Sequence, residues 1–140
     1  MRRTLILALL IGALLSACNL VAGAPEPTPF RDLPLIRFAT PLSGASVAEG
    51  EELVIQLIAE DPTGVGVARV ELNIDDLPHH DAMPVVSSAV PVFTVDMNWL
   101  ARGVGLHSLA AIAYRPDGTA SDPAIIRVLV APPDAPTQSP

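Results

Sequence analysis

The chain has very little of several residue types, and each shortage narrows what the protein can be. It has one cysteine among 140 residues, Cys18, so an internal disulfide is excluded. All eight of its basic residues are arginine, which we attribute to genomic base composition rather than to chemistry. Only 4% of the residues are aromatic, so a hydrophobic core must be built mainly from valine, isoleucine, leucine and alanine.

Positive charge is scarce as well. The formal net charge is −7, and two of the eight arginines, Arg2 and Arg3, lie at the extreme N-terminus. An acidic chain repels phosphate backbones, which argues against nucleic acid as a partner. The chain also lacks a basic patch that would hold it to anionic lipid, so any membrane attachment must come from the N-terminus.

The longest apolar run is short for a membrane span. Residues 4–17 are 14 uncharged residues behind Arg2 and Arg3, whereas a span needs roughly 20. A positive start, an apolar run and a small-residue end form the layout of a secretory signal. Two alternatives stay open: an uncleaved anchor extended through Ala24, and ordinary cleavage after Ala24, where Pro25 would suit the peptidase poorly.

The end of this run is Leu15-Ser16-Ala17-Cys18, which resembles the lipobox of bacterial lipoproteins. The resemblance implies a signal peptide over residues 1–17, cleavage before Cys18, and acylation of the Cys18 sulfur and its new amino group. One acyl chain anchors a protein marginally and two or more hold it firmly; the lipoprotein family carries up to three. We therefore expect the protein to be lipid-anchored on the extracytoplasmic side of the cell membrane or outer envelope.

Proline-rich segments flank a central region. We expect residues 18–34 to form an extended tether that reaches about 50 Å at most, although a leftover without a role is the alternative. Residues 132–140 are expected to be a disordered tail. The central region, 35–131, has about 97 residues, enough for one domain with a hydrophobic core.

Within 35–131, short apolar or alternating segments are separated by turn signals. Segment 67–74 has apolar residues at every second position, which is typical of a half-buried strand, and segment 52–59 is apolar on both faces and should be central in its sheet. We expect 77–84 to be a loop. The expected strands are Leu35–Ala39, Glu52–Ala59, Val67–Ile74, Val92–Trp99, Leu106–Tyr114 and Ala124–Val130, with Val85–Val86 as a short edge strand.

No segment of this region has sustained helical periodicity, and no internal repeat is present, which excludes solenoids and propellers. About seven short strands separated by turns predict an all-β fold, an antiparallel β-sandwich.

Several short motifs occur in a fixed order along this region. They are Pro41-x-x-Gly44, Ala59-Glu60-Asp61, Gly64-Val65 before Val67-Ala68-Arg69-Val70-Glu71-Leu72, Gly105-Leu106-His107-Ser108-Leu109 and Arg115-Pro116-Asp117-Gly118. Together they resemble bacterial immunoglobulin-like domains of surface proteins. The resemblance implies an immunoglobulin-like sandwich that serves adhesion, spacing or docking without catalysis. The chain departs from the pattern at Arg115, where the family often has aspartate, at Pro116 and in the irregular segment 77–90.

The first candidate for site chemistry is the run His79-His80-Asp81. Two imidazoles and a carboxylate are plausible zinc or copper ligands. Adjacent residues of a strand point to opposite faces, however, and no C-x-x-C or H-E-x-x-H motif accompanies them. A solvated loop is the plainer interpretation, and we assign no metal ligand.

Carboxylates at strand ends are the second candidate. If gathered at one pole of a sandwich, they could bind calcium, which takes 6–8 oxygen ligands. Turn formation and solubility are the plainer uses of such residues. The carboxylates are Glu60, Asp61, Asp75, Asp76 and Asp117.

Two further sets are weaker. The residue types of a hydrolase triad are present in Ser87, Ser88, Asp96 and His107, but without a nucleophile elbow they carry little meaning. Trp99 could be a glycan-stacking ring, but it shares a strand face with apolar residues and is expected in the core.

The sequence therefore predicts no enzyme and no cofactor. It predicts a membrane-anchored immunoglobulin-like module for protein docking, adhesion or spacing. The alternatives are an anchored glycan- or calcium-binding module and a non-catalytic subunit of an exported complex. It names neither the partner nor the oligomeric state.

Overall fold

The computed structural model describes residues 32–133. The expected signal peptide, Cys18, and most of the two proline-rich segments lie outside these residues. Within them the chain forms eight strands and no helix, and therefore no helix able to cross a membrane. The strands are β1 (Leu35–Thr40), β2 (Ser46–Ala48), β3 (Glu52–Glu60), β4 (Arg69–Ile74), β5 (Leu77–Ala82), β6 (Val92–Leu100), β7 (Gly105–Tyr114) and β8 (Ala124–Ala131).

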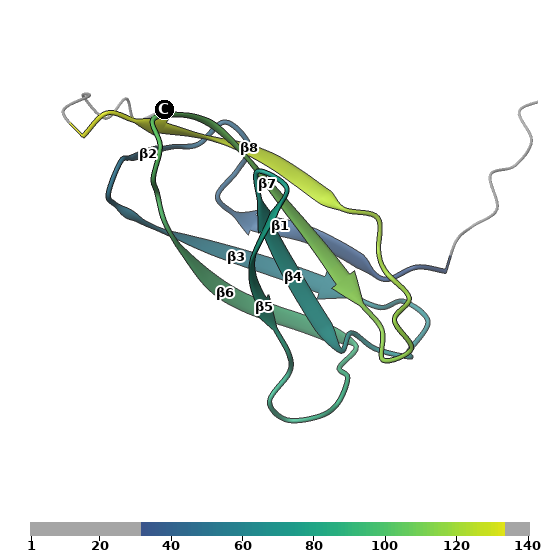
Figure 1. Cartoon of the computed structure of the whole chain (residues 1–140). Coiled ribbons are helices and arrows are strands. Elements are labelled where there is room, and N and C mark those ends of the chain that lie inside the picture. The colour runs from purple at the N-terminus through teal and green to yellow at the C-terminus, as the bar shows by residue number, and fades with distance from the viewer. Residues whose placement is uncertain (1–31, 134–140) are drawn as a thin grey trace, which may run out of the picture. The chain divides into compact units, whose positions relative to one another are not determined.

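The strands form two sheets that pack face to face, as Figure 1 shows. One sheet has the order β1-β3-β6, and the other has the order β2-β8-β7-β4-β5. All pairs are antiparallel except β2 with β8, which is parallel. The predicted immunoglobulin-like β-sandwich is confirmed.

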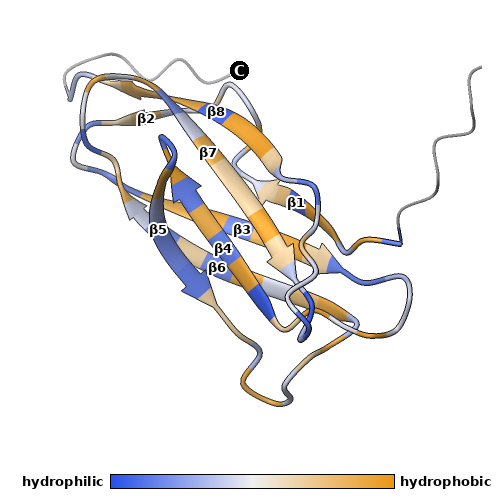
Figure 2. Cartoon of the chain, turned by 45° about the vertical axis from the view of Figure 1, so that its right-hand side comes forward, coloured by the Kyte–Doolittle hydropathy of each residue, from blue (hydrophilic) through white to orange (hydrophobic). Residues whose placement is uncertain are grey.

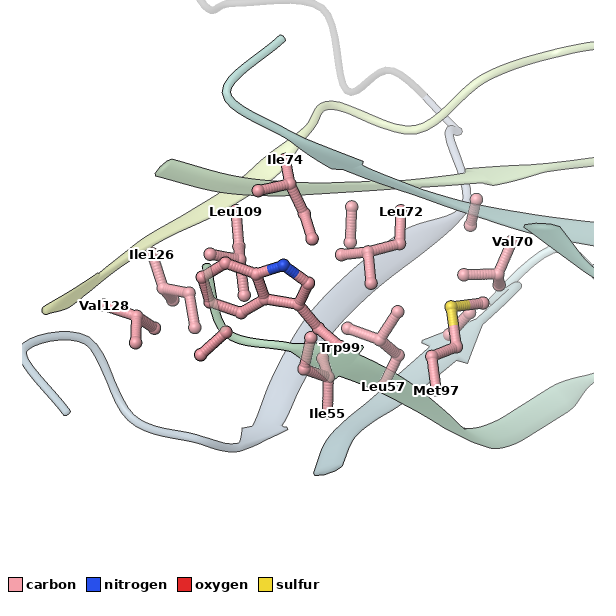
Figure 3. Close-up of a cluster of buried hydrophobic side chains, with 14 of the residues drawn as sticks. Ile55, Leu57, Val70, Leu72, Ile74, Met97, Trp99, Leu109, Ile126 and Val128 are labelled. Atoms are coloured by element: carbon pink, nitrogen blue, oxygen red, sulfur yellow. The ribbon is translucent and has the colours of Figure 1, made fainter. Parts of the chain in front are cut away.

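The core lies between the two sheets and follows from the alternation of side chains along each strand. Ile55, Leu57 and Ala59 of β3 and Leu109 of β7 have no exposed surface, while Trp99 of β6 lies among them. Figure 3 shows the Trp99 ring within this cluster of aliphatic side chains. The expected core position of Trp99 and the central position of β3 are therefore both confirmed.

The segment from 77 to 91 differs from its prediction. Residues 77–82 were expected in a loop, but they form the edge strand β5, which pairs with β4. Their polar sequence gave no hydropathy signal because an edge strand outside the core needs only backbone partners. Val85 and Val86 were expected in a strand, but they lie in the β5–β6 loop with 99% and 85% of their surface exposed. Two β-branched residues do not make a strand without a neighbouring backbone to pair with.

β2 was not predicted from the sequence. It has only three residues, and it is held by parallel pairing with the C-terminal end of β8. Packing also begins slightly before residue 35, since Pro34 is fully buried.

The sandwich has two ends, which we name by the loops they carry. The N-terminal pole is the end at which β1 begins, and it carries the β3–β4, β5–β6 and β7–β8 loops. Register places Leu35 beside Glu60 and Glu60 beside Val92, so the start of β1 is two strands away from the end of the β5–β6 loop. The opposite pole carries the β4–β5 turn and the β6–β7 loop.

Candidate functional site

The histidine pair considered as metal ligands lies on β5, an edge strand of the five-stranded sheet. His80 pairs with Leu72 and Pro78 pairs with Asn73, so His79 lies at an irregularity of β5 where the simple alternation of faces does not hold. The His79 Nε2 lies 3.1 Å from the backbone carbonyl oxygen of Asn98 on β6. This hydrogen bond bridges the open edge between the two sheets, because β5 and β6 are edge strands of different sheets. Among residues 32–133, no three histidine, cysteine or acidic side chains are grouped closely enough to hold a metal ion.

The strand-end carboxylates are divided between the two poles. Glu60, Asp61 and Asp117 lie at the N-terminal pole, whereas Asp75 and Asp76 form the β4–β5 turn at the opposite pole. Asp117 accepts a hydrogen bond from the backbone N–H of Thr119, as expected for a turn carboxylate. The structure therefore does not assemble the carboxylates that a calcium site would need.

Asp61 is held in a cradle of five donors. Its carboxylate is fully buried and accepts from the Thr63 backbone N–H at 3.0 Å, the Thr63 hydroxyl at 2.8 Å and the Gly66 N–H at 2.9 Å. The Nε and Nη2 of Arg115 complete the set at 2.8 and 2.9 Å. Arg115 thus occupies the side of the carboxylate where a cation would bind.

The charges of this pair are stabilised by each other. The Arg115 guanidinium, with help from the Thr63 and Gly66 donors, holds the pKa of Asp61 far below its ordinary value despite burial. The same contact raises the pKa of Arg115. From the sequence, Asp61 is a candidate calcium ligand and Arg115 a departure from a motif, and their pairing is not predicted. Their opposite charges at the ends of two strands were the available signal.

A second polar network lies at the opposite pole around His107. The His107 Nδ1 is 2.6 Å from Asp75 Oδ2, and its Nε2 contacts the backbone carbonyl oxygen of Gly103. Both neighbours are acceptors, so the ring satisfies both contacts only when both nitrogens carry protons. The Gly103 carbonyl and the Asp75 carboxylate raise the pKa of His107, whose ring also meets the Trp99 ring edge to face at 5.3 Å.

The residue types of a hydrolase triad are not brought together. Ser87 and Ser88 lie in the β5–β6 loop at the N-terminal pole, while His107 lies near the opposite pole. Asp96 is in the middle of β6 and accepts a hydrogen bond from Gln56 Nε2 at 3.0 Å. No catalytic geometry links these groups.

The outer face of the five-stranded sheet carries two different surfaces. On β4 and β7, Arg69 lies 4.1 Å from the centre of the Tyr114 ring and 2.9 Å from the Glu71 carboxylate. The hydrogen bond between Arg69 and Glu71 lowers the pKa of Glu71 and raises that of Arg69. On β7 and β8, Leu106 faces Leu129 across the two strands.

We name the second of these surfaces the β7–β8 strip, and it consists of Leu106, Ile125 and Leu129. These side chains are 59%, 61% and 44% exposed, and they point away from the core because their strand neighbours point into it. In Figure 2 the ribbons of β7 and β8 are largely hydrophobic, whereas β5 is largely hydrophilic. Both strands are predicted from the sequence, but their outward faces are not.

The fold has close parallels among solved structures. A fibronectin(III)-like module of CbhA from Clostridium thermocellum matches with a TM-score of 0.58 and 24% identity, over 70% of this chain and 98% of that one. The CARDB domain of PF1109 from Pyrococcus furiosus matches at 0.53 and 12% identity, over 72% and 98% of the two chains. The PKD domain of an M14-like peptidase from Thermoplasmatales archaeon SCGC AB-540-F20 also matches at 0.53 and 12%, over 71% and 93%.

Sequence comparisons add nothing to this assignment. No protein-family model matches the chain, and no curated protein matches it. At these identities the structural parallels establish the fold and not a ligand. The described part of the chain is an immunoglobulin-like sandwich of the kind found in bacterial and archaeal fibronectin(III)-like, CARDB and PKD domains.

Proposed function

We propose that the protein is a lipid-anchored, extracytoplasmic immunoglobulin-like module that docks to another protein of the cell envelope and does not catalyse a reaction. The observation that carries the proposal is Leu15-Ser16-Ala17-Cys18, a lipobox-like end to a signal-like run, followed by a proline-rich segment that leads into the sandwich. The chain thus supplies an anchor, a spacer and one folded module in that order.

The contacts within the sandwich support a role without catalysis. Asp61 is saturated by five donors, His107 is held between Asp75 and Gly103, and Asp96 is bonded to Gln56. Each of these three side chains therefore helps to hold strands and loops in place.

The β7–β8 strip supports docking to a protein. Its three large aliphatic side chains lie on one sheet face, and exposed Arg127 lies between Ile125 and Leu129 on β8. An apolar surface with a polar margin is typical of a protein interface. The buried position of Trp99 and the separation of the carboxylates leave the glycan- and calcium-binding alternatives without a structural feature in their favour.

The decisive experiment is the mass of the mature N-terminal peptide, isolated from the membranes of a bacterial host. We expect a diacylated or triacylated peptide that begins at Cys18. In a Cys18→Ala variant, the protein should be released or remain unprocessed. An unmodified peptide that begins at Met1 or Pro25 would overturn the anchoring proposal.

Docking is tested separately with a Leu106→Ser/Leu129→Ser variant, which should keep the melting temperature and lose chemical cross-links to envelope proteins that the wild type forms. Exposed Val54→Ser, on the outer face of the three-stranded sheet, is the control. Unchanged cross-links in the double variant would contradict docking through the strip.

A further inference from the structure

The N-terminal pole presents large apolar side chains that no other part of residues 32–133 covers. We name these the tip residues: Val65 of the β3–β4 loop, and Met83, Val85 and Val86 of the β5–β6 loop. Between 52% and 99% of their surface is exposed. Residues 83–91 contain no charged side chain, and Figure 2 shows this loop extending beyond the strands.

The two loops are fixed to each other at their bases. The Val67 N–H donates to the Val90 carbonyl at 2.7 Å, and the Val90 N–H donates back at 3.0 Å. The Asp61 N–H donates to the Pro91 carbonyl at 2.9 Å, and the Asp61 carboxylate accepts a hydrogen bond from the Gly66 N–H. The loops that carry the tip residues are therefore held in place at their bases by these hydrogen bonds.

The N-terminal segment enters the domain at the same pole. The start of β1 is two strands from Val92, which is on the order of 10 Å at the usual strand spacing. Residues 19–31 separate Cys18 from the described domain, a reach of roughly 45 Å when fully extended. A lipid anchor at Cys18 would keep this pole close to the bilayer at a high effective concentration.

We infer that the tip residues insert into the lipid bilayer that holds the Cys18 acyl chains, so that the sandwich rests on the membrane by its N-terminal pole. The inference depends on the proposed lipid anchor. Aliphatic side chains without neighbouring charge suit the interfacial region of a bilayer, and the anchor makes even a weak contact effective.

The charge distribution of the pole sets the orientation. The β7–β8 loop at the same pole carries Asp117 and Asp122, which repel an anionic surface, whereas the tip residues lie on the other two loops. The domain should therefore tilt toward its β5–β6 loop, and its insertion should be stronger on zwitterionic lipid, which does not repel the acidic loop.

The test uses the acylated full chain in phosphatidylcholine vesicles. Because Cys18 is acylated, Ser87→Cys in the tip loop supplies the one free thiol for an environment-sensitive fluorophore. Arg102→Cys, exposed in the β6–β7 loop at the opposite pole, is the matched control. Lipids with a quencher near the headgroup end of the acyl chain then report on membrane depth.

We expect strong quenching of the label at position 87 and none at position 102. The additional changes Val85→Ser and Val86→Ser should reduce quenching at position 87 to the level of the control, with an unchanged melting temperature because both side chains are exposed. Vesicle flotation and the N-terminal peptide mass are measured on the same samples.

The outcomes separate the two proposals. If the protein floats with vesicles and carries acyl chains, but the label at position 87 is unquenched or both positions are quenched equally, the insertion of the tip residues is overturned and the anchor stands. If the protein carries no acyl chains and does not float, both proposals fail.

Discussion

Asp61 and Arg115, which are 54 residues apart in the sequence, form a two-point ion pair that joins the two sheets of the sandwich. Asp61 follows β3 of the three-stranded sheet, and Arg115 follows β7 of the five-stranded sheet. Arginine suits this position because its planar guanidinium meets both carboxylate oxygens at once.

Loss of the Asp61 charge should destabilise the domain strongly. Asp61→Asn keeps the shape of the side chain but leaves donors around it without a carboxylate, and breaking a buried pair in this way typically costs about 3 kcal/mol or more. Urea unfolding measures the change. Asp117→Asn, an exposed turn carboxylate at the same pole, is the control and should change stability much less. Equal effects of the two substitutions would show that the buried pair of Asp61 and Arg115 does not stabilise the domain.

The same pair predicts that the free energy of unfolding falls at acid pH. The pKa of Asp61 is lowered in the folded state from an ordinary value of 3.8, so its contribution to stability is present above that value and is lost as the pH falls below it. The free energy of unfolding of the wild type should therefore fall between pH 4 and pH 2 more steeply than that of Asp61→Asn. Parallel profiles for the two proteins would contradict this assignment.

Two glycines of the β3–β4 loop should respond differently to the same substitution. Gly64 and Gly66 both have a positive φ, 83° and 96°, so alanine is strained at either position by about 1–2 kcal/mol. A Cβ at Gly64 meets open space, whereas a Cβ at Gly66 would lie 3.1 Å from the Ala89 Cβ and 3.2 Å from the Val90 backbone. Gly66→Ala should therefore lower the melting temperature more than Gly64→Ala. If Gly64→Ala proves equally damaging, the close approach of the two loops is not the cause.

Opposite faces of β7 supply a test of the core. Leu109 is fully buried, whereas Leu106 on the same strand is 59% exposed. Leu109→Ala should cost about 2–5 kcal/mol through lost contacts and a residual cavity, and Leu106→Ala should stay within about 0.5 kcal/mol. Chemical unfolding of the two variants measures both values. A large loss from Leu106→Ala would mean that its face is covered within the protein rather than free for docking.

The sequence predicts the parts of the fold that depend on alternation and turns. Segment 92–99 has a clear period of two, and its apolar set, which includes Trp99, is the inward face as predicted. Strands without such a pattern were missed, namely β2 with three residues and the polar β5. Their conformation is set by backbone pairing with β8 and β4, and this pairing leaves no hydropathy signal.

The pairing of polar side chains could not be predicted from the sequence for a related reason. The sequence gives the candidates Asp61, Asp75, His107 and Arg115, but not which of them meet. Asp61 meets Arg115 because of the way β3 and β7 end at one pole, and Asp75 meets His107 because the β4–β5 turn lies beside the start of β7. Long-range register decides both pairs, so neighbouring residues in the sequence carry no information about them.

The contact between His107 and Trp99 predicts a pH-dependent fluorescence signal. Trp99 is the single tryptophan of the chain, and a protonated imidazole beside an indole quenches its emission. The pKa of His107 is raised from 6.5, so emission should rise with pH through a midpoint above 6.5. Stability gained from the charged ring is fully present below pH 6.5 and is lost as the pH rises through the raised pKa. His107→Gln should abolish the fluorescence transition, whereas His80→Gln on the exposed strand β5 should leave it intact. A midpoint at or below 6.5, or a transition that survives in His107→Gln, would mean that the ring is not held between Asp75 and Gly103 in solution.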